Sequence, residues 1–147
     1  LFRSPIGGCV SKIINTIEES GGSIVAYELC SSIRNNRELV DESNPDVYDA
    51  LAKKYLNIGC ACMMNNDKRI QLLDDLIDEF KIDGVIDVAL QSCHPFNVEG
   101  NRIKEFVTND KNIHYMAIET DYSQSDTEQL RTRFEAFIEM IEEVKCY

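Results

Sequence analysis

The sequence predicts an α/β domain with a doubly wound sheet of about four parallel strands and helices on both faces. Short β-branched runs alternate with amphipathic stretches of about ten to fifteen residues, a pattern typical of βαβ units. The chain has 147 residues, enough for one apolar core. Because no repeat or linker divides it, we expect a single domain over residues 1–147.

Four runs are expected to be strands because they are short, rich in apolar residues and bounded by turn residues. They cover residues 1–6, 23–30, 83–90 and 113–119. In a parallel sheet the carboxyl ends of all strands lie at one edge, and ligands bind there. Residues that follow these strands are therefore the first candidates for a site.

Five stretches are expected to be helices because their apolar residues recur every three or four positions. They cover residues 10–19, 44–56, 67–80, 98–107 and 125–141. Asn44, Asp67 and Ser125 are the expected N-caps, the last in a capping box with the glutamate three residues later. Pro45 suits a first helical turn. The apolar stripe of the second helix consists of Val47, Leu51 and Tyr55.

The charge of the chain excludes some partners. Fifteen basic and 26 acidic residues give a net charge of −11, which repels phosphate backbones and anionic membranes, so we expect neither nucleic acid nor a membrane as a partner. No apolar run approaches the ~20 residues that span a bilayer. Without a signal-like leader, the expected location is cytoplasmic. Because Leu1 stands in place of a methionine, we expect a piece of a longer protein.

The cysteine content is high for a domain without a leader. The six cysteines stand at positions 9, 30, 60, 62, 93 and 146. In a reducing compartment such density favours metal or redox chemistry over disulfides. Cys60-Ala-Cys62 is one residue short of CxxC, so the spacing matches no zinc ribbon. Cys146, near the end of the sequence, is interpreted as incidental, and any metal ligands must converge from distant segments.

The expected topology brings three cysteines to the carboxyl edge of the sheet. Cys30 closes the second strand, Cys93 follows the third, and Cys60 lies in a loop on the same side. Alone, each is more simply a small buried apolar residue, but three at one ligand-binding edge favour a joint role. Cys9 and Cys62 stay open as further members. If the loop is extended, Cys60 and Cys62 point opposite ways, so only one faces the site.

Two alternatives stay open on the residues alone. Cys93 beside His94 suggests a thiol nucleophile, but adjacent side chains rarely meet and His114 begins a strand at the opposite edge. The glycines of residues 6–12 and the polar loop "IETDYSQSD" suggest a module that binds a coenzyme A-type ligand or a partner chain. In that loop Glu119 and Asp121 are either an acid–base pair or turn residues. Catalytic residues stay unassigned.

Two long segments carry a family resemblance. "DGVIDVALQSCHPFNVEGNRIKEF" and "IETDYSQSDTEQLRTRFEAFIEMIEE" resemble the carboxy-terminal part of the 2-hydroxyacyl-CoA dehydratase family, which includes the D-component of 2-hydroxyglutaryl-CoA dehydratase, benzoyl-CoA reductase subunits and double-cubane cluster proteins. The likeness continues through "YELCSS", "AKKYLNIGCACM" and "GGCVSKIINTIEESGG". It therefore spans essentially the whole chain in order.

The resemblance implies one flavodoxin-like lobe of a two-lobe, oxygen-sensitive iron–sulfur protein of an anaerobe. Cys30, Cys60 and Cys93 match cysteine positions that ligate the cluster, either [4Fe–4S] or a double cubane. An ATP-dependent iron–sulfur activator supplies one low-potential electron. The thioester carbonyl of an (R)-2-hydroxyacyl-CoA becomes a ketyl radical that expels the hydroxyl group, a lyase reaction. The implied partners are the upstream lobe, the activator, the acyl-CoA and, in a homo- or heterodimer, a second subunit.

Three departures from the family pattern qualify these expectations. Gly59 replaces the family's proline, which implies a looser loop. The upstream lobe and its share of the ligands are absent, so the cluster is not expected to be complete in this chain alone. His94 and the "NVE" at residues 97–99 favour the double-cubane branch, whose members reduce small molecules.

Overall fold

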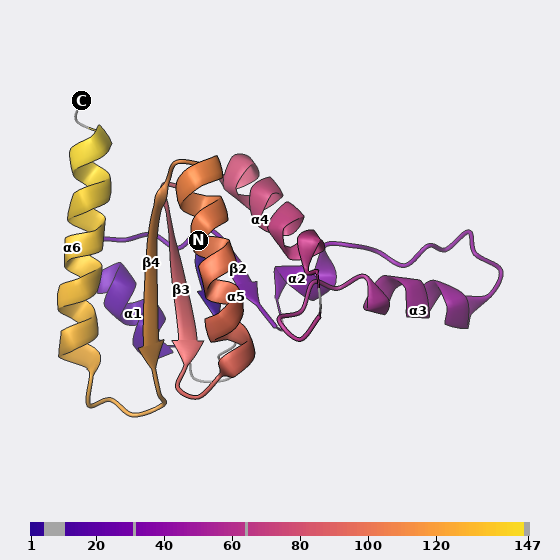
Figure 1. Ribbon diagram of the computed structural model, residues 1–147, viewed down its shortest axis with the longest axis horizontal. Helices are drawn as coiled ribbons and strands as arrows, with labels where there is room; N and C mark the ends of the chain where they lie inside the picture. The colour runs from indigo at the N-terminus through magenta and orange to yellow at the C-terminus, as the bar shows by residue number, and fades with distance from the viewer. Residues whose placement is uncertain (5–10, 31, 64, 146–147) are drawn as a thin grey trace.

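The computed structural model describes residues 1–4, 11–30, 32–63 and 65–145. Its strands pair in the order β2-β1-β3-β4, and every neighbouring pair is parallel (Figure 1). The strands are β1 (Phe2–Ser4), β2 (Tyr27–Leu29), β3 (Gly84–Leu90) and β4 (His114–Thr120). The predicted α/β class with a parallel sheet is confirmed.

The strand register explains why β2 is shorter than predicted. β3 and β4 pair along their whole length, from Gly84 with His114 to Leu90 with Thr120. β2 pairs only with the three residues of β1, from Tyr27 to Leu29. Residues 23–26, which were expected to begin this strand, lie outside the register with β1 and form an irregular segment.

The helices cover both faces of the sheet. They are α1 (Ser11–Glu19), α2 (Ile33–Asn36), α3 (Val47–Leu56), α4 (Asp67–Phe80), α5 (His94–Glu105), the π-helical turn η1 (Phe106–Asp110) and α6 (Thr127–Lys145). α1 and α6 lie on one face, and α4 and α5 on the other (Figure 1). The sequence did not predict α2, and α5 begins four residues before the predicted start at position 98.

The alternation of β3 divides the core in two. Ile86 and Val88 face the cluster that α1 and α6 complete with Ile17 and Phe134. Val85 points the other way, into the cluster supplied by α4 and α5. Because successive strand side chains point to opposite faces, a strand buried on both sides must be apolar at almost every position, as β3 is.

Helix α3 departs from the prediction in its cap and its packing. Asp46, and not Asn44, is the N-cap, and its carboxylate accepts hydrogen bonds from the N–H groups of Tyr48 and Asp49. The predicted apolar stripe is not buried, since Val47 and Tyr55 are 63% and 59% exposed. α3 lies away from the sheet (Figure 1). An amphipathic pattern shows which residues share a face but does not show what covers it.

Two other predicted caps are displaced by one residue. Asn66 precedes α4, and Asp67 is the first helical residue. α6 begins at Thr127, and the Ser125 hydroxyl lies 2.8 Å from that of Ser123. The Asn66 side chain makes no capping hydrogen bond at α4. Its amide group donates instead to the carbonyl oxygen of Cys60.

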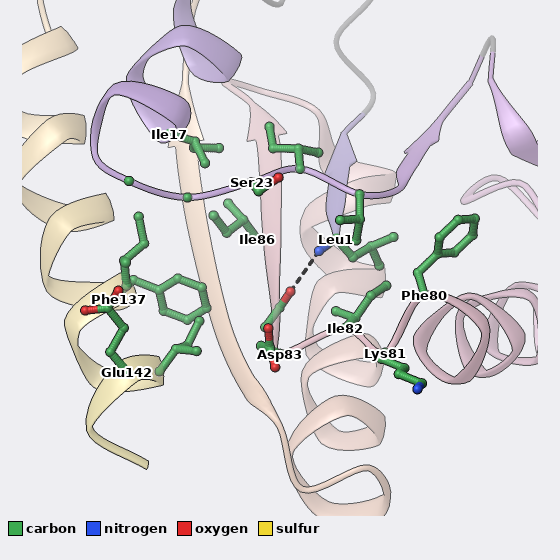
Figure 2. Close-up of a pocket in the computed structure, with 17 residues that line it drawn as sticks. Leu1, Ile17, Ser23, Phe80, Lys81, Ile82, Asp83, Ile86, Phe137 and Glu142 are labelled. Carbon is green, nitrogen blue, oxygen red and sulfur yellow. Dashed lines mark hydrogen bonds between the residues drawn. The ribbon is translucent and has the colours of Figure 1, made fainter. Parts of the chain in front are cut away.

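A cavity lies at the amino ends of the strands, opposite to the edge where ligands bind in parallel sheets. Mainly apolar side chains line it, among them Ile17, Ile86 and Phe137, with Phe80 and Ile82 across from them (Figure 2). None of the cysteines that the structure describes lines this cavity. Among the described residues, no helix combines the length and the apolar character that a membrane crossing requires.

Candidate functional site

Four cysteines stand at or beside the carboxyl edge of the sheet. Cys30 directly follows β2, and Cys93 follows β3 in a turn closed by a 2.9 Å hydrogen bond from its N–H to the carbonyl oxygen of Leu90. Cys60 and Cys62 lie in the loop between α3 and α4. All four are free thiols; Cys60 and Cys93 are half-buried, and the others are exposed. Cys9 and Cys146 lie outside the described residues.

The structure gathers the four thiols into one electrostatic neighbourhood. The pKa of the Cys62 thiol is raised, first by the charge of Cys60, then by a hydrogen bond with Cys60, by burial, and by the charges of Cys93 and Cys30. These influences fall off with distance, so each of the three cysteines predicted as ligands lies within electrostatic range of Cys62. Cys62, which the sequence left open, belongs to the same group. Thiolates placed together repel one another, and a bound cation relieves that repulsion.

The donor atoms of this group are all thiol sulfurs. Among the described residues, no three His, Cys, Asp or Glu side chains are close enough to hold one metal ion. Iron–sulfur clusters distribute their thiolate ligands over several iron atoms, so those ligands stand further apart than the ligands of one ion. A donor set made only of thiols is also the set that selects clusters. The thiol donors present therefore fit an iron–sulfur cluster.

The turn that carries Cys30 is fixed by short polar contacts. The Ser32 hydroxyl donates to the carbonyl oxygen of Tyr27 at 2.6 Å and accepts from the N–H of Leu29 at 2.9 Å. The side-chain amide of Asn35 donates to the carbonyl oxygen of Cys30 at 2.5 Å. These bonds close the backbone directly after β2, so Cys30 has a defined place at the edge.

The loop that carries Cys60 packs tightly against α4. The carbonyl oxygen of Cys60 accepts from the Asn66 side-chain amide at 2.8 Å and from the N–H of Met63 at 2.9 Å. A Cβ added at Gly59 would lie 2.9 Å from the backbone nitrogen of Arg69. The glycine thus allows a close approach to α4 that a proline ring would obstruct, and the expectation of a looser loop stays a prediction.

Cys93 occupies the N-cap position of α5, with φ −83° and ψ 79°. His94 and Pro95 form the first turn of this helix, not a turn before it. Proline early in a helix was the available sequence signal for this earlier start. The amino end of α5, which carries the positive end of the helix dipole, thus lies at Cys93.

A buried set of charged side chains lies among the elements that carry the cysteines, and the sequence analysis did not find it. Glu28 and Arg69 have fully buried side chains, and Arg34 and Glu99 are nearly so. We call Glu28, Arg34, Asn66, Arg69 and Glu99 the Arg69 network. The one sequence signal for this network was Glu28, a charged residue within a strand predicted to be buried. Nothing in the sequence indicates that Glu28 pairs with Arg69, or Arg69 with Glu99.

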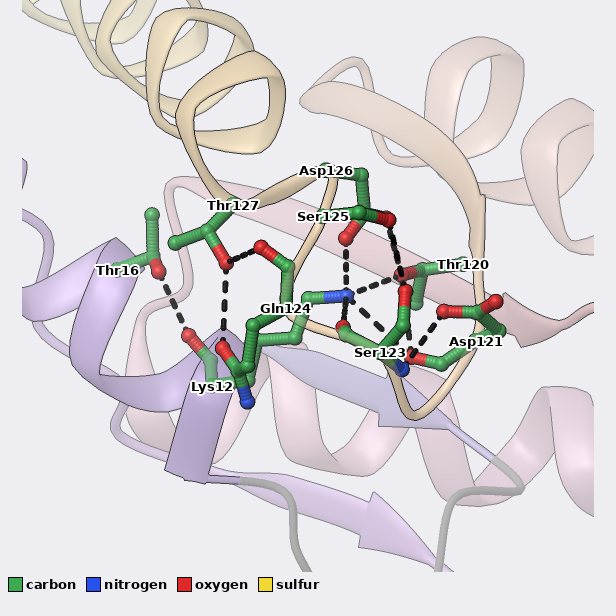
Figure 3. A network of polar contacts seen from close by, with 9 residues as sticks. All are labelled: Lys12, Thr16, Thr120, Asp121, Ser123, Gln124, Ser125, Asp126 and Thr127. Carbon is green, nitrogen blue, oxygen red and sulfur yellow. Dashed lines mark hydrogen bonds and ion pairs between the residues drawn. The ribbon is translucent and has the colours of Figure 1, made fainter.

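A second polar network, which we call the Lys12 network, holds the loop after β4. The Lys12 ammonium, only 4% exposed, donates to the Thr120 hydroxyl at 2.9 Å, to the carbonyl oxygen of Ser123 at 2.6 Å, and to the Asp126 carboxylate (Figure 3). Burial opposes the ionisation of Asp126, but hydrogen bonds from Lys12 and Thr120 outweigh it and lower the pKa of that carboxyl.

The carboxylates in and beside the same loop accept hydrogen bonds from neighbouring residues. The Asp121 carboxylate accepts from the Ser123 hydroxyl and from the Ser123 N–H, the latter at 2.8 Å, and these bonds lower its pKa. Glu119 accepts a 3.2 Å hydrogen bond from the Asn97 side chain. Asp121 is therefore a turn residue, and the contacts favour the structural interpretation over the acid–base pair. His114 begins β4 at the opposite edge, as predicted, and contacts Phe137 edge to face.

Two curated proteins are similar to this chain along most of its length. "Putative dehydratase subunit YjiM" of Escherichia coli (strain K12) is 51% identical over 137 residues, which are 93% of this chain and 36% of that protein. "(R)-phenyllactyl-CoA dehydratase beta subunit" of Clostridium sporogenes is 28% identical over 130 residues, or 88% of this chain and 34% of that protein. The chain thus spans about a third of the length of each relative.

A comparison with protein families gives a match along almost the whole chain. The matching family is described as "2-hydroxyglutaryl-CoA dehydratase, D-component", and the match covers residues 2–141. It confirms the resemblance found in the sequence. The chain belongs to the 2-hydroxyglutaryl-CoA dehydratase D-component family.

Proposed function

We propose that this chain is the flavodoxin-like, cluster-binding lobe of a 2-hydroxyacyl-CoA dehydratase-type lyase, with Cys30, Cys60 and Cys93 as cluster ligands. The observation that carries the proposal is the gathering of thiols from three separate segments at the carboxyl edge of the sheet. Family membership supports the reaction class. The strand order β2-β1-β3-β4 supports a flavodoxin-like winding, because it is the order with which that fold begins.

The residues have separable roles in this proposal. Cys30, Cys60 and Cys93 hold the iron through their sulfur atoms, and the α5 dipole beside Cys93 stabilises negative charge on the ligand set. A bound cluster supplies single-electron chemistry for the elimination of water from an (R)-2-hydroxyacyl-CoA thioester. The electron comes from an ATP-dependent iron–sulfur activator. The upstream lobe supplies the remaining enclosure of the site, and the enzyme works as a dimer in the reducing cytoplasm of an anaerobe, where thiols persist.

The test uses the complete protein, reconstituted anaerobically with iron and sulfide. We expect about four iron atoms per single-cubane site, with thiolate-to-iron charge-transfer absorption. Cys93→Ser should lose most of both, whereas Cys146→Ser, the matched cysteine control, should keep them. Activity is then measured with (R)-2-hydroxyacyl-CoA, activator and ATP. Unchanged iron and absorption in Cys93→Ser would show that the ligand assignment is wrong.

The fourth thiol favours a second candidate, a double-cubane reductase of small molecules. Cys62 lies in the same neighbourhood as the three proposed ligands, and a double cubane requires more thiolates than a single one. About twice the iron per chain, with reduction of small molecules and no dehydration, would select this candidate. Thermal stabilisation by acyl-CoA in protein that never takes up iron would instead select the non-catalytic binding module.

A further inference from the structure

The three segments that carry the proposed ligands are joined to one another by the Arg69 network. Glu28 lies two residues before Cys30, Asn66 and Arg69 follow the loop of Cys60, and Glu99 lies in the helix that Cys93 caps. The residues are separated in sequence by 41 positions between Glu28 and Arg69 and by 30 between Arg69 and Glu99. The network is therefore tertiary and has no local origin.

The first link joins β2 to α2 and α4. The Glu28 carboxylate accepts from Arg34 Nε at 2.6 Å and from Arg69 Nη2 at 2.6 Å. The side chains of Glu28 and Arg69 have no exposed surface, and that of Arg34 is 2% exposed. The carboxylate is therefore shared between two cations, one on the helix after Cys30 and one on the helix after Cys60.

The second link joins α4 to α5. Arg69 Nη1 donates to the Glu99 carboxylate at 2.5 Å. The guanidinium carbon of Arg69 lies 4.6 Å from the centre of the Phe96 ring, and that of Arg34 lies 6.0 Å from it. Planar cations stacked on a ring are held in orientation as well as position. The turn of α5 that follows Cys93 is thus fixed to α4 by both charge and stacking.

The third link reaches a ligand residue directly. The Asn66 side-chain amide donates to the carbonyl oxygen of Cys60 and to the Glu99 carboxylate. One amide group therefore fixes the backbone of the Cys60 loop to the helix that Cys93 caps. Gly59 lies so close to α4 that an added Cβ would meet both Arg69 and Asn66.

Stability alone does not account for this arrangement. Buried charge networks often contribute no more stability than apolar side chains of the same volume, because each charge loses its hydration. Such networks do fix which groups meet and in what geometry. Here two carboxylates and two guanidinium groups balance in charge, so the network joins the segments without adding net charge beside the thiols.

We propose that the Arg69 network is the positioning device of the thiol site, which sets the mutual placement of Cys30, Cys60 and Cys93 before any metal enters. The inference rests on the proposed function, because positioning matters only if these thiols bind a common group. Asn66, Arg69 and Glu99 are positioning residues in this proposal, since they act through the cysteine-bearing backbone. Partners of this kind typically change metal affinity by about 10- to 100-fold when they are removed.

The experiment measures metal capture by the complete protein without activity as a readout. Metal-free protein is titrated with Co²⁺, whose thiolate charge-transfer absorption reports two or more sulfur ligands on each ion, and reconstituted protein is exposed to an iron chelator. The variants are Asn66→Ala and the near-isosteric Glu99→Gln. The matched control is Asn101→Ala, which removes an exposed amide hydrogen bond from α5 outside the network. Melting temperatures of all metal-free proteins are recorded.

We expect both variants to bind Co²⁺ about tenfold more weakly and to release iron about tenfold faster. Asn101→Ala should match the wild type. Wild-type Co²⁺ affinity and iron release in both variants would overturn the positioning role, even if their melting temperatures fall. Glu99→Gln preserves the shape of the side chain but removes its charge and replaces one of its two accepting oxygens by an amide donor. It therefore decides the question if Asn66→Ala does not fold. If the wild type captures neither metal, the proposed function fails, and this inference fails with it.

Discussion

The Lys12 network and the Arg69 network lie at the same edge of one sheet, but the first contacts a single loop and the second connects several segments. Lys12 concentrates its bonds on one loop, residues 120–126, and its Asp126 partner is 25% exposed. Arg69 joins two carboxylates from different elements, and its own side chain has no exposed surface. The first network fixes the shape of a loop, and the second fixes the distance between segments. Removal should therefore have a local effect in one and a global effect in the other.

The largest expected effect is that of Arg69→Met. It leaves Glu28 and Glu99 without their shared cation in a buried place, and breaking a buried ion pair costs about 3–5 kcal/mol. We expect the free energy of unfolding, measured by urea denaturation, to fall by about that amount. Arg102→Met, which removes an exposed ion pair with Asp67, is the control and should cost about 0–1 kcal/mol. Equal losses in the two variants would contradict the buried network.

A smaller and more local effect is expected for Lys12→Met. The carbonyl oxygens of Asp121 and Ser123 lose a donor, while Thr120 and Asp126 keep a 2.6 Å hydrogen bond to each other. We expect a loss of about 1–3 kcal/mol and faster hydrogen exchange confined to residues 120–126. Co²⁺ binding by the thiols should not change. A loss of Co²⁺ affinity would show that the two networks are not independent.

Gly59→Ala tests the close contact at the Cys60 loop. Its Cβ would meet the backbone nitrogen of Arg69 at 2.9 Å, which forces the loop to shift. Overpacking of this kind costs about 1–3 kcal/mol, and the shift should also weaken Co²⁺ binding. The control is Ser23→Ala, in the irregular segment before β2. Gly21→Ala, in the same segment as Ser23, is not suitable because the φ of +94° at Gly21 strains any side chain. Stability and Co²⁺ affinity as in the wild type would show that the loop tolerates a side chain.

The smallest effect is a dependence of stability on pH in the Lys12 network. The folded pKa of Asp126 is lower than its unfolded value, so its ionised form contributes stability above about pH 4, and this contribution is lost as the pH falls through the folded pKa. Asp126→Asn should therefore be less stable than the wild type at pH 7 and should lose less stability on acidification below about pH 4. The free energy of unfolding of both proteins is measured by urea denaturation between about pH 7 and about pH 3. An equal loss of stability on acidification in the two proteins would exclude this linkage.

Most elements of the fold could be predicted because they depend on local periodicity. The runs that became β3 and β4 were placed within one residue at each end, since their apolar character is continuous. Caps were less accurate, because several polar residues precede each helix; Asp46 and Asn66 occupy the positions expected for Asn44 and Asp67. The exposed stripe of α3 could not be predicted, because packing depends on what lies opposite.

The site also has features that the sequence predicts and features that depend on three-dimensional packing. The placement of Cys30 and Cys93 at one edge followed from topology, because parallel strands deliver their following residues to the same edge. Cys60 was expected there because its loop lies on the same side. The ion pairs of Arg69 could not be predicted, since the choice of partner depends on the three-dimensional placement of α4 and α5. The ligand role of the cysteines stays a prediction.

The central claim is that the gathered thiols hold an iron–sulfur cluster, and iron Mössbauer spectroscopy of the anaerobically purified complete protein tests it most directly. The account predicts iron coordinated by sulfur in a cluster, present in the wild type and largely lost in a variant with Cys30, Cys60 and Cys93 all replaced by serine. The same cluster signal in that variant, or no cluster iron in a folded and reconstituted wild type, would contradict it.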